Sequence, residues 1–312
     1  MSATATVAQP AARTVTFAKG GTMTHGPDAE IGVLRDSSHL ADNPHELRAR
    51  LAEDGYLLIR GLHDRQAVLT ARREILERMG DAVDRSKPLD EGWIAPGRSG
   101  NFAGGADQAP AFHALVESPS GVMGFFDRFF GAPSTTFNFK WLRQVSTGEF
   151  TGSHYDVVYM GRGSHDLYTV WTPLGDIGLD QGPLAINVGS HRLDSFAPLR
   201  TTYGRMDVDR DHVQGWFEDD PRAITRQFGG RWATAEFRAG DALIFGMFTM
   251  HASLTNTSGC YRLTCDCRYQ RQGDPIDERW IAKNGAPPIG HYAWHEPGKS
   301  VDMKDARKAW AI

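Results

Sequence analysis

The sequence has few cysteines and no long apolar segment, and each absence excludes a class of protein. Its three cysteines, Cys260, Cys265 and Cys267, are an odd number close together, which excludes a disulfide framework and favours a reducing compartment, the cytoplasm. No apolar run approaches the roughly 18 residues of a membrane-spanning helix, so we expect no membrane partner.

The chain also lacks an excess of basic residues. It has 34 Lys and Arg against 38 Asp and Glu, a net charge of −4. A dedicated nucleic-acid binder would show a basic excess, so we expect no nucleic-acid partner. A small anionic substrate stays possible, because one arginine in a pocket is enough to bind it. The partner we expect is therefore a small molecule, and the sequence leaves the oligomeric state open.

No repeat, charge block or long linker divides the 312 residues. The length allows two domains, but large β enzymes often use such a length for one. We expect a flexible N-terminal leader over 1–30 and a single domain over 31–312. Within it, a helical first half would pack on a barrel from about 134 to 271, followed by an ordered C-terminal wrap over 272–312.

The hydrophobic pattern changes along the chain from a helical period to a period of two. Helical periodicity predicts helices over 64–80 and 118–131, and a short helix near 45–54 precedes a strand over 55–62. Six later segments alternate and are separated by Gly, Pro, Asn or Asp, which predicts strands. These segments are 135–145, 150–160, 167–174, 184–191, 235–254 and 261–271, and we expect 235–254 to be two strands split at Ala239-Gly240. The pattern is typical of a mainly β sandwich or barrel with flanking helices.

The segment His154-Tyr155-Asp156 has the spacing of a metal site. On a strand, residues i and i+2 point to the same face, so His154 and Asp156 could bind one ion from one side. A third ligand must come from elsewhere, and His251, at the end of an apolar strand, is the candidate. Two histidines and one carboxylate suit non-haem Fe(II) with three open positions better than structural zinc. His-x-Asp alone is also common by chance.

Arg262 follows His251 by eleven residues, across the turn SLTNTSGC. We expect its strand to return beside the His251 strand as a hairpin, which would bury Arg262 near the metal. On this strand Arg262, Thr264, Asp266 and Arg268 share one face, which we expect to point toward the pocket. A buried arginine needs an anion, and its planar group matches a carboxylate at two points. The distal carboxylate of 2-oxoglutarate is such an anion. The alternative is an ordinary ion pair with Asp266 or a surface acid.

Together these motifs resemble a known family. His154-x-Asp156, His251 and Arg262 occur in the order and spacing of the phytanoyl-CoA dioxygenase-like family of Fe(II)/2-oxoglutarate-dependent oxygenases. The segments LYTVWTPLGDIGLDQGPLAINVGSHR (167–192) and HASLTNTSGCYR (251–262) are similar to family segments, as is AGDALIFGMFTMH before the second histidine. The resemblance spans roughly 50–270 and is strongest in 150–192 and 240–270.

The resemblance implies a double-stranded β-helix, a jelly-roll or cupin-like barrel. It implies that His154, Asp156 and His251 bind the catalytic iron and that Arg262 binds the 5-carboxylate of 2-oxoglutarate. It places secondary contacts to 2-oxoglutarate at Thr169, Trp171, Ser253 and Arg143.

The implied reaction consumes 2-oxoglutarate and molecular oxygen, releases succinate and CO₂, and oxidises a C–H bond of a small molecule. Halogenating relatives have a small residue at the position of Asp156, so the carboxylate favours hydroxylation, or a related oxidation such as desaturation. Two alternatives stay open. One is a cupin-type metal dioxygenase that uses no 2-oxoglutarate, and the other is a non-catalytic β-barrel that binds a ligand. The substrate is not readable, and the family's CoA thioester is not carried over.

Overall fold

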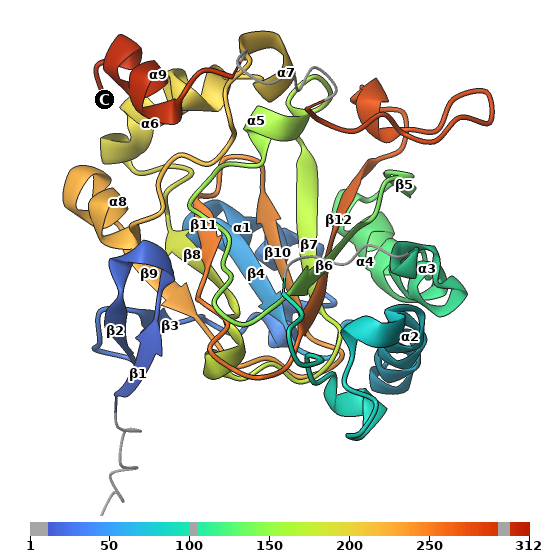
Figure 1. Ribbon diagram of the computed structural model, residues 1–312. Coiled ribbons are helices and arrows are strands. Elements are labelled where there is room, and N and C mark those ends of the chain that lie inside the picture. The colour runs from blue at the N-terminus through green and yellow to red at the C-terminus, as the bar shows by residue number, and fades with distance from the viewer. Residues whose placement is uncertain (1–11, 100–104, 293–299) are drawn as a thin grey trace, which may run out of the picture.

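Two β-sheets face each other at the centre of the computed structural model, with helices outside them (Figure 1). The structure describes residues 12–99, 105–292 and 300–312. The six-stranded sheet runs in the order β4-β10-β7-β12-β5, and β6 also pairs with β12. The four-stranded sheet runs β11-β8-β9-β3, antiparallel except for the parallel pair β3 and β9. The predicted mainly β fold with flanking helices is therefore confirmed, although the two sheets do not close into a barrel within the described ranges.

The strands of the larger sheet are β4 (Tyr56–Ile59), β5 (Ser134–Thr136), β6 (Trp141–Val145), β7 (Leu167–Pro173), β10 (Ala242–Gly246) and β12 (Arg262–Arg271). Those of the smaller sheet are β3 (Gly32–Val33), β8 (Leu184–Val188), β9 (Arg231–Thr234) and β11 (His251–Ser253).

Strand β12 shows how the sequence pattern directs side chains. Successive residues of a strand point to opposite faces. The apolar set, Leu263, Cys265, Cys267 and Tyr269, packs outward in the core under the helices. The polar set, Arg262, Thr264, Asp266 and Arg268, therefore points between the two sheets, and all four side chains are buried there. The expected polar face of this strand is thus directed at the interior.

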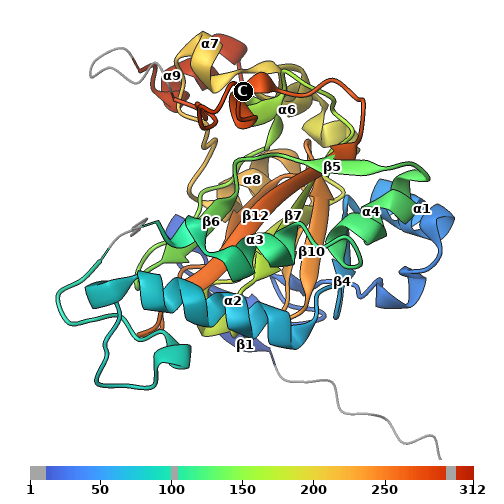
Figure 2. The same cartoon turned by 90° about the vertical axis from the view of Figure 1, so that its right-hand side faces the viewer.

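Four helices cover the outer face of the larger sheet (Figure 2). They are α1 (Pro44–Asp54), α2 (Arg65–Arg78), α3 (Pro110–Val116) and α4 (Val122–Phe130). Helix α2 begins as predicted, because the Asp64 side chain accepts a hydrogen bond from the Ala67 amide. Helix α4 begins four residues later than predicted, since Ser118 to Gly121 form a turn closed by the Ser118 side chain.

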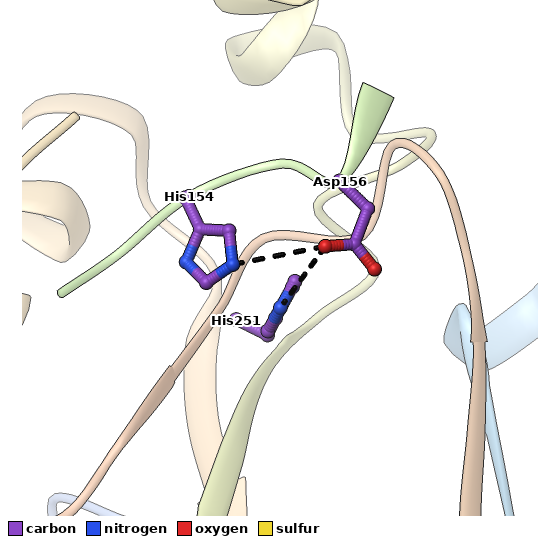
Figure 3. A group of neighbouring side chains, drawn as sticks. All are labelled: His154, Asp156 and His251. Carbon is purple, nitrogen blue, oxygen red and sulfur yellow. Dashed lines mark ion pairs between the residues drawn. The ribbon is translucent and has the colours of Figure 1, made fainter. Parts of the chain in front are cut away.

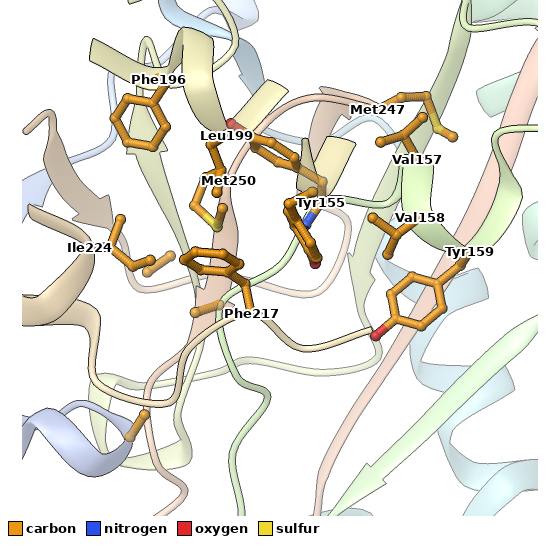
Figure 4. Close-up of a cluster of buried hydrophobic side chains, with 14 of the residues drawn as sticks. Tyr155, Val157, Val158, Tyr159, Phe196, Leu199, Phe217, Ile224, Met247 and Met250 are labelled. Carbon is orange, nitrogen blue, oxygen red and sulfur yellow. The ribbon is translucent and has the colours of Figure 1, made fainter. Parts of the chain in front are cut away.

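A second hydrophobic core surrounds α5 (Val157–Met160) and packs against the smaller sheet (Figure 4). The other helices here are α6 (Ala197–Thr201), α7 (Val208–Asp211), α8 (Pro221–Phe228) and α9 (Met303–Trp310). Tyr155 is completely buried in this core, next to Tyr203 and Phe248. Because Tyr155 lies between His154 and Asp156, this packing fixes the segment that carries both predicted ligands.

The predicted leader over 1–30 is wrong for the part that the structure describes. Strands β1 (Arg13–Thr16) and β2 (Thr22–His25) form a two-stranded sheet. Between them, Phe17 is fully buried and its ring lies 5.1 Å from that of Trp232. This contact with a residue more than 200 positions away has no local signal. Residues 1–11 of the prediction lie outside the described residues.

Two predicted strands are interrupted. Over 150–160, only isolated bridges form at Ser153 and His154, and the chain then turns into α5. The segment 235–254 turns at Ala239-Gly240 as predicted, but a second turn at Met247-Phe248 separates β10 from β11, which belong to different sheets. The residues around this second turn are largely buried, so the apolar pattern contained no sign of it.

The predicted hairpin between the His251 strand and the Arg262 strand is also wrong. Strand β11 pairs with β8, whereas β12 pairs with β5, β6 and β7 in the facing sheet. The connection crosses between sheets and is held by Asn256, whose side-chain amide donates to the carbonyls of Val145 and Cys260. Arg262 therefore approaches the interior from the sheet opposite His251.

The C-terminal wrap expected over 272–312 packs against the rest of the chain in its described part, where Trp280 is fully buried and α9 was not predicted. Residues 293–299 of this segment lie outside the described residues. None of the helices in the described ranges is long and apolar enough to cross a membrane.

Candidate metal centre

The three predicted metal ligands converge (Figure 3). His154 Nε2 lies 3.7 Å from Asp156 Oδ1, and His251 Nε2 lies 3.8 Å from the same oxygen. The three ligand atoms all lie within 4.8 Å of one another, and each of the three residues is at most 4% exposed. Residues almost 100 positions apart are thus brought to one point.

The backbone holds the two histidines together directly. The His154 amide donates to the His251 carbonyl at 3.0 Å, and the His251 amide donates back at 3.2 Å. Asp156 reaches the centre in a different way from the one predicted. Its backbone is helical and it precedes the first turn of α5, so a bend after Tyr155, and not strand alternation, turns its carboxylate toward the histidines.

Both imidazoles have their tautomer fixed. His154 Nδ1 lies 2.8 Å from the Gly152 carbonyl oxygen, and His251 Nδ1 lies 3.0 Å from that of Thr249. A carbonyl only accepts hydrogen bonds, so each Nδ1 carries the proton and donates it. Each Nε2 therefore directs a lone pair at the centre, as in histidines that bind metals.

The charge states also fit a cation. Burial, followed by the proximity of His251, holds the pKa of His154 well below its ordinary value, and burial likewise lowers the pKa of His251. Burial alone would raise the pKa of Asp156, but the Arg268 charge, together with the hydrogen bond from Thr169, outweighs it and keeps that pKa below its usual range. Two neutral imidazoles and one carboxylate face each other, an arrangement that a divalent ion stabilises. The donor set fits the facial triad of non-haem Fe(II).

The second carboxylate oxygen of Asp156 is held by neighbouring strands. The Thr169 hydroxyl and Arg268 Nη2 both donate to Oδ2, the latter at 3.1 Å, which leaves Oδ1 for an ion. The sequence predicted Arg268 on the polar face with Arg262, as part of a polar pocket, but not its contact with Asp156. The predicted contact of Thr169 with 2-oxoglutarate stays a prediction.

Arg262 is buried and lacks an acidic partner among the described residues. Its exposed fraction is 1%, and its Nε and Nη2 make no hydrogen bond. Burial and the nearby Arg143 lower its pKa to about 10, so it is still charged at neutral pH. The expected alternative, a pair with Asp266, does not form, because Asp266 pairs with Arg143.

The unsatisfied atoms of Arg262 belong to a row along β12. Thr264 Oγ1, Asp266 Oδ1 and Arg268 Nε also have no hydrogen-bond partner in the described structure. Four consecutive inward positions thus each present a buried polar atom without a partner. Such atoms are rare in folded proteins and cost free energy, so a clustered row of them indicates the binding site of a polar molecule.

The other predicted contacts lie at different places around the interior. The ring of Trp171 packs against Phe237 at 4.7 Å, in the apolar cluster between the sheets. Ser253 is buried on β11, where its hydroxyl oxygen accepts a hydrogen bond from the Thr151 amide. Arg143 faces the interior from β6, paired with Asp266. Their contacts with 2-oxoglutarate stay predictions.

A cavity of about 390 Å³ opens beside His154 and Asp156. A second cavity, of about 900 Å³, is bounded by Val157 and Met247 and contains none of the three ligands. The smaller cavity, and not the larger one, is therefore the space into which the metal centre opens.

A family model described as phytanoyl-CoA dioxygenase (PhyH) matches residues 51–264. Among curated proteins, none matches the chain significantly.

Solved structures with a similar fold include the following three proteins. The non-heme alpha ketoglutarate dependent carbocyclase SnoK from nogalamycin biosynthesis has a TM-score of 0.54 and 20% identity, over 86% of this chain and 96% of SnoK. EctD from S. alaskensis has a TM-score of 0.53 and 14% identity, over 94% of this chain and 95% of EctD. The epimerase SnoN from nogalamycin biosynthesis has a TM-score of 0.52 and 18% identity, over 83% of this chain and 92% of SnoN. At these identities the likeness shows the fold, the double-stranded β-helix that the sequence predicted.

Proposed function

Because this chain belongs to the phytanoyl-CoA dioxygenase family, we propose that it hydroxylates a C–H bond of a small molecule, consuming 2-oxoglutarate and O₂ and releasing succinate and CO₂. Family membership and the buried triad place it among the Fe(II)- and 2-oxoglutarate-dependent oxygenases. The observation that carries the proposal is the convergence of two fixed imidazole lone pairs on an ionised carboxylate.

In this proposal, Nε2 of His154, Nε2 of His251 and Oδ1 of Asp156 hold the iron. Bound ferrous iron supplies the redox chemistry that couples O₂ and 2-oxoglutarate to C–H oxidation. The protein's part is to fix three donors on one side of the ion. Thr169 and Arg268 keep Asp156 ionised and oriented, and the buried position of all three ligands limits access of water.

Arg262 binds the distal carboxylate of 2-oxoglutarate. It offers an unpaired, buried guanidinium, whose planar donors suit a carboxylate at two points. Thr264 extends the row of unpartnered atoms toward the centre. A cupin-type enzyme that uses no 2-oxoglutarate would leave the Arg262 cation without an anion. A non-catalytic ligand-binding barrel would not require the converging His154, Asp156 and His251. Both alternatives therefore fit the geometry less well.

The carboxylate at position 156 favours oxygen insertion over halogenation. Its Oδ2 is fixed by two donors, so the side chain occupies the place that the halogenating relatives leave to chloride. Hydroxylation is the outcome we propose, with desaturation as the related oxidation. The three thiols, none of which forms a disulfide in the described structure, agree with the cytoplasmic location that we propose.

Binding of 2-oxoglutarate tests the function directly. Under anaerobic conditions, Fe(II) and 2-oxoglutarate together should produce a visible charge-transfer absorbance with wild-type protein. Arg262→Met should weaken 2-oxoglutarate binding by about 10- to 100-fold, the loss of a charge-assisted hydrogen-bonded pair, and Arg262→Lys should restore only part of it.

The matched control is His39→Gln, a substitution of an exposed histidine outside the site, which should behave as wild type. His154→Ala should abolish the absorbance. Iron-bound wild-type protein that shows no affinity for 2-oxoglutarate would contradict the proposal.

A further inference from the structure

Aromatic rings surround the cavity beside the metal centre, and the charged groups that line it are already paired. We propose that the substrate is a flat, uncharged molecule containing an aromatic or conjugated ring. This inference rests on the proposed function, because it takes this cavity of about 390 Å³ as the substrate site. That volume lies at the lower end of the range of small-molecule pockets.

One side of the cavity is a continuous group of rings that starts at a metal ligand. The Tyr159 ring lies edge-on to His154, with centroids 5.7 Å apart. His291 lies 5.2 Å from Tyr159, and Trp141 lies 6.4 Å from His291. A flat ring packed on this group would therefore lie beside the iron ligands, where C–H oxidation takes place.

Trp216 also lines the cavity. Its ring lies 6.3 Å from Phe150 in a stacked arrangement, yet 44% of the residue is exposed, which makes it one of only four large hydrophobic residues exposed in the described structure. A tryptophan that served only the core would be covered. An exposed indole in the lining of a cavity is instead a surface available for stacking.

Two glycines make room for these rings. A Cβ atom at Gly215 would lie 2.2 Å from the Tyr159 hydroxyl, and one at Gly152 would lie 2.9 Å from the Trp216 ring. Real Cβ atoms do not approach so closely, so a larger residue at either position would displace the ring. The chain thus has its smallest residue next to each of two rings that line the cavity.

The charges of the lining are neutralised before any substrate enters. Arg143 pairs with Asp266, and Arg268 pairs with Asp156. The Arg268 guanidinium also lies 4.3 Å from the centre of the Trp141 ring. Among the described residues, the buried atoms of these pairs that stay without a hydrogen-bond partner are one donor, Arg268 Nε, and one acceptor, Asp266 Oδ1, which a neutral polar group can satisfy together. A charged substrate would lose its water without meeting an unbalanced opposite charge, which is costly, whereas an uncharged flat ring gains stacking on the aromatic lining.

Three probes with one carbon skeleton separate charge from flatness. We would measure, by calorimetry under anaerobic conditions and with Fe(II) and 2-oxoglutarate bound, the affinities of 2-naphthamide, 2-naphthoate and decahydro-2-naphthamide. The proposal predicts that flat, neutral 2-naphthamide binds at least about tenfold more tightly than either of the others, equivalent to about 1.4 kcal/mol. Equal or tighter binding of the anion or the saturated amide overturns it, as does the absence of 2-naphthamide binding.

Variants locate the binding. Trp216→Ala should weaken 2-naphthamide by about tenfold while 2-oxoglutarate affinity is unchanged, and Trp216→Phe should retain most of the affinity. Trp93→Phe, at a tryptophan that contacts Lys87 and does not line this cavity, is the matched control. An unchanged affinity in Trp216→Ala overturns the assignment. Loss of 2-oxoglutarate binding in the wild type would instead be the failure of the proposed function, so the two failures are distinguishable.

Discussion

At the scale of single residues, Arg268 has two effects on one carboxylate. It donates to Oδ2 of Asp156 and helps to hold the Asp156 pKa low, so it both orients the ligand and keeps it charged. Outer hydrogen bonds of this kind typically change metal affinity by about 10- to 100-fold.

We therefore expect Arg268→Met to weaken metal binding by about 10- to 100-fold, because the apolar side chain keeps the volume and removes the donor. Titration of metal-free protein with Mn(II), followed by electron paramagnetic resonance, measures this without turnover. Arg65→Met, at an exposed arginine paired with Asp176, is the control and should bind as wild type. Equal affinity in Arg268→Met and wild type would contradict the positioning role.

His63 should make stability depend on pH. Burial lowers the pKa of His63 to about 4, while its ordinary value is 6.5. The unfolded chain therefore binds the proton more readily between these values, and stability is full above pH 6.5 and is lost as the pH falls toward 4. For this residue, we expect a loss of about 2 kcal/mol between pH 7.5 and pH 5.

Urea unfolding at the two pH values tests this, with His63→Gln against His39→Gln. Glutamine at 63 still offers a partner to the Thr172 hydroxyl, which lies 3.1 Å from His63 Nε2. His63→Gln should lose about 2 kcal/mol less than wild type on acidification. His39→Gln should follow wild type, and parallel losses in all three proteins would show that His63 does not contribute.

The sequence identified individual residues best where a motif contains the chemistry. The ligand triad is found from His154-x-Asp156 and a histidine after an apolar strand, and the structure brings those three together. The hydrogen bonds from Thr169 and Arg268 to Asp156 were not predicted. They depend on β7 and β12 pairing so that Thr169 lies opposite Arg268, and the sequence of either strand alone does not determine this register.

At the scale of elements, the segment from His154 to Asp156 depends on the core beneath it. Tyr155 is fully buried there, and its hydroxyl makes no hydrogen bond in the described structure. The ring thus anchors the two ligands by packing, and the hydroxyl is a polar group buried at a cost.

We expect Tyr155→Phe to leave the free energy of unfolding unchanged or to raise it, because it removes only the unpartnered hydroxyl. Tyr155→Ala should lower that free energy by about 3–5 kcal/mol through the cavity left behind. Chemical denaturation of the metal-free variants measures both. A loss above about 1 kcal/mol in Tyr155→Phe would reveal a hydrogen bond of this hydroxyl.

Helices were predicted more closely than strands, for a physical reason. Asp64 marks the start of α2 because its side chain caps the helix, and a cap residue can be recognised from the local sequence. The strands around the site are buried on both faces, so their apolar pattern did not show where β10 ends and β11 begins in the other sheet. The hairpin error at Arg262 has the same origin.

At the scale of the whole molecule, the candidate metal centre joins parts of the chain that are distant in sequence. His251 lies on the smaller sheet, and Asp156 accepts a hydrogen bond from Arg268 of the larger sheet. Residues next to both ligands pack in the core around α5. An ion bound here exists only in the folded chain, so its binding free energy adds to stability.

We expect Mn(II) at about 100 times its Kd to stabilise the fold by about 2.7 kcal/mol, which corresponds to a rise in Tm of roughly 5 °C. Differential scanning calorimetry measures the shift. His154→Ala and Asp156→Ala should show none at the same concentration, whereas His39→Gln should shift as wild type. An equal shift in the triad variants would place the ion elsewhere.

The general architecture was accessible from the sequence because it follows from patterning, with helices first and alternating strands later. The β1–β2 sheet could not be predicted, because Phe17 next to it packs against Trp232, which is far along the chain. Such a long-range contact forms only in the folded protein and leaves no pattern in the local sequence.

The mutual hydrogen bonds of His154 and His251 make these two ligands a single mechanical unit. The backbones of the two histidines therefore cannot move apart without breaking this peptide pair. Asp156 stands outside the unit and is held from the facing sheet, by Thr169 and Arg268. One backbone pair thus sets the spacing of two donors and the opposite sheet sets the position of the third, so the centre is complete only while the two sheets keep their separation.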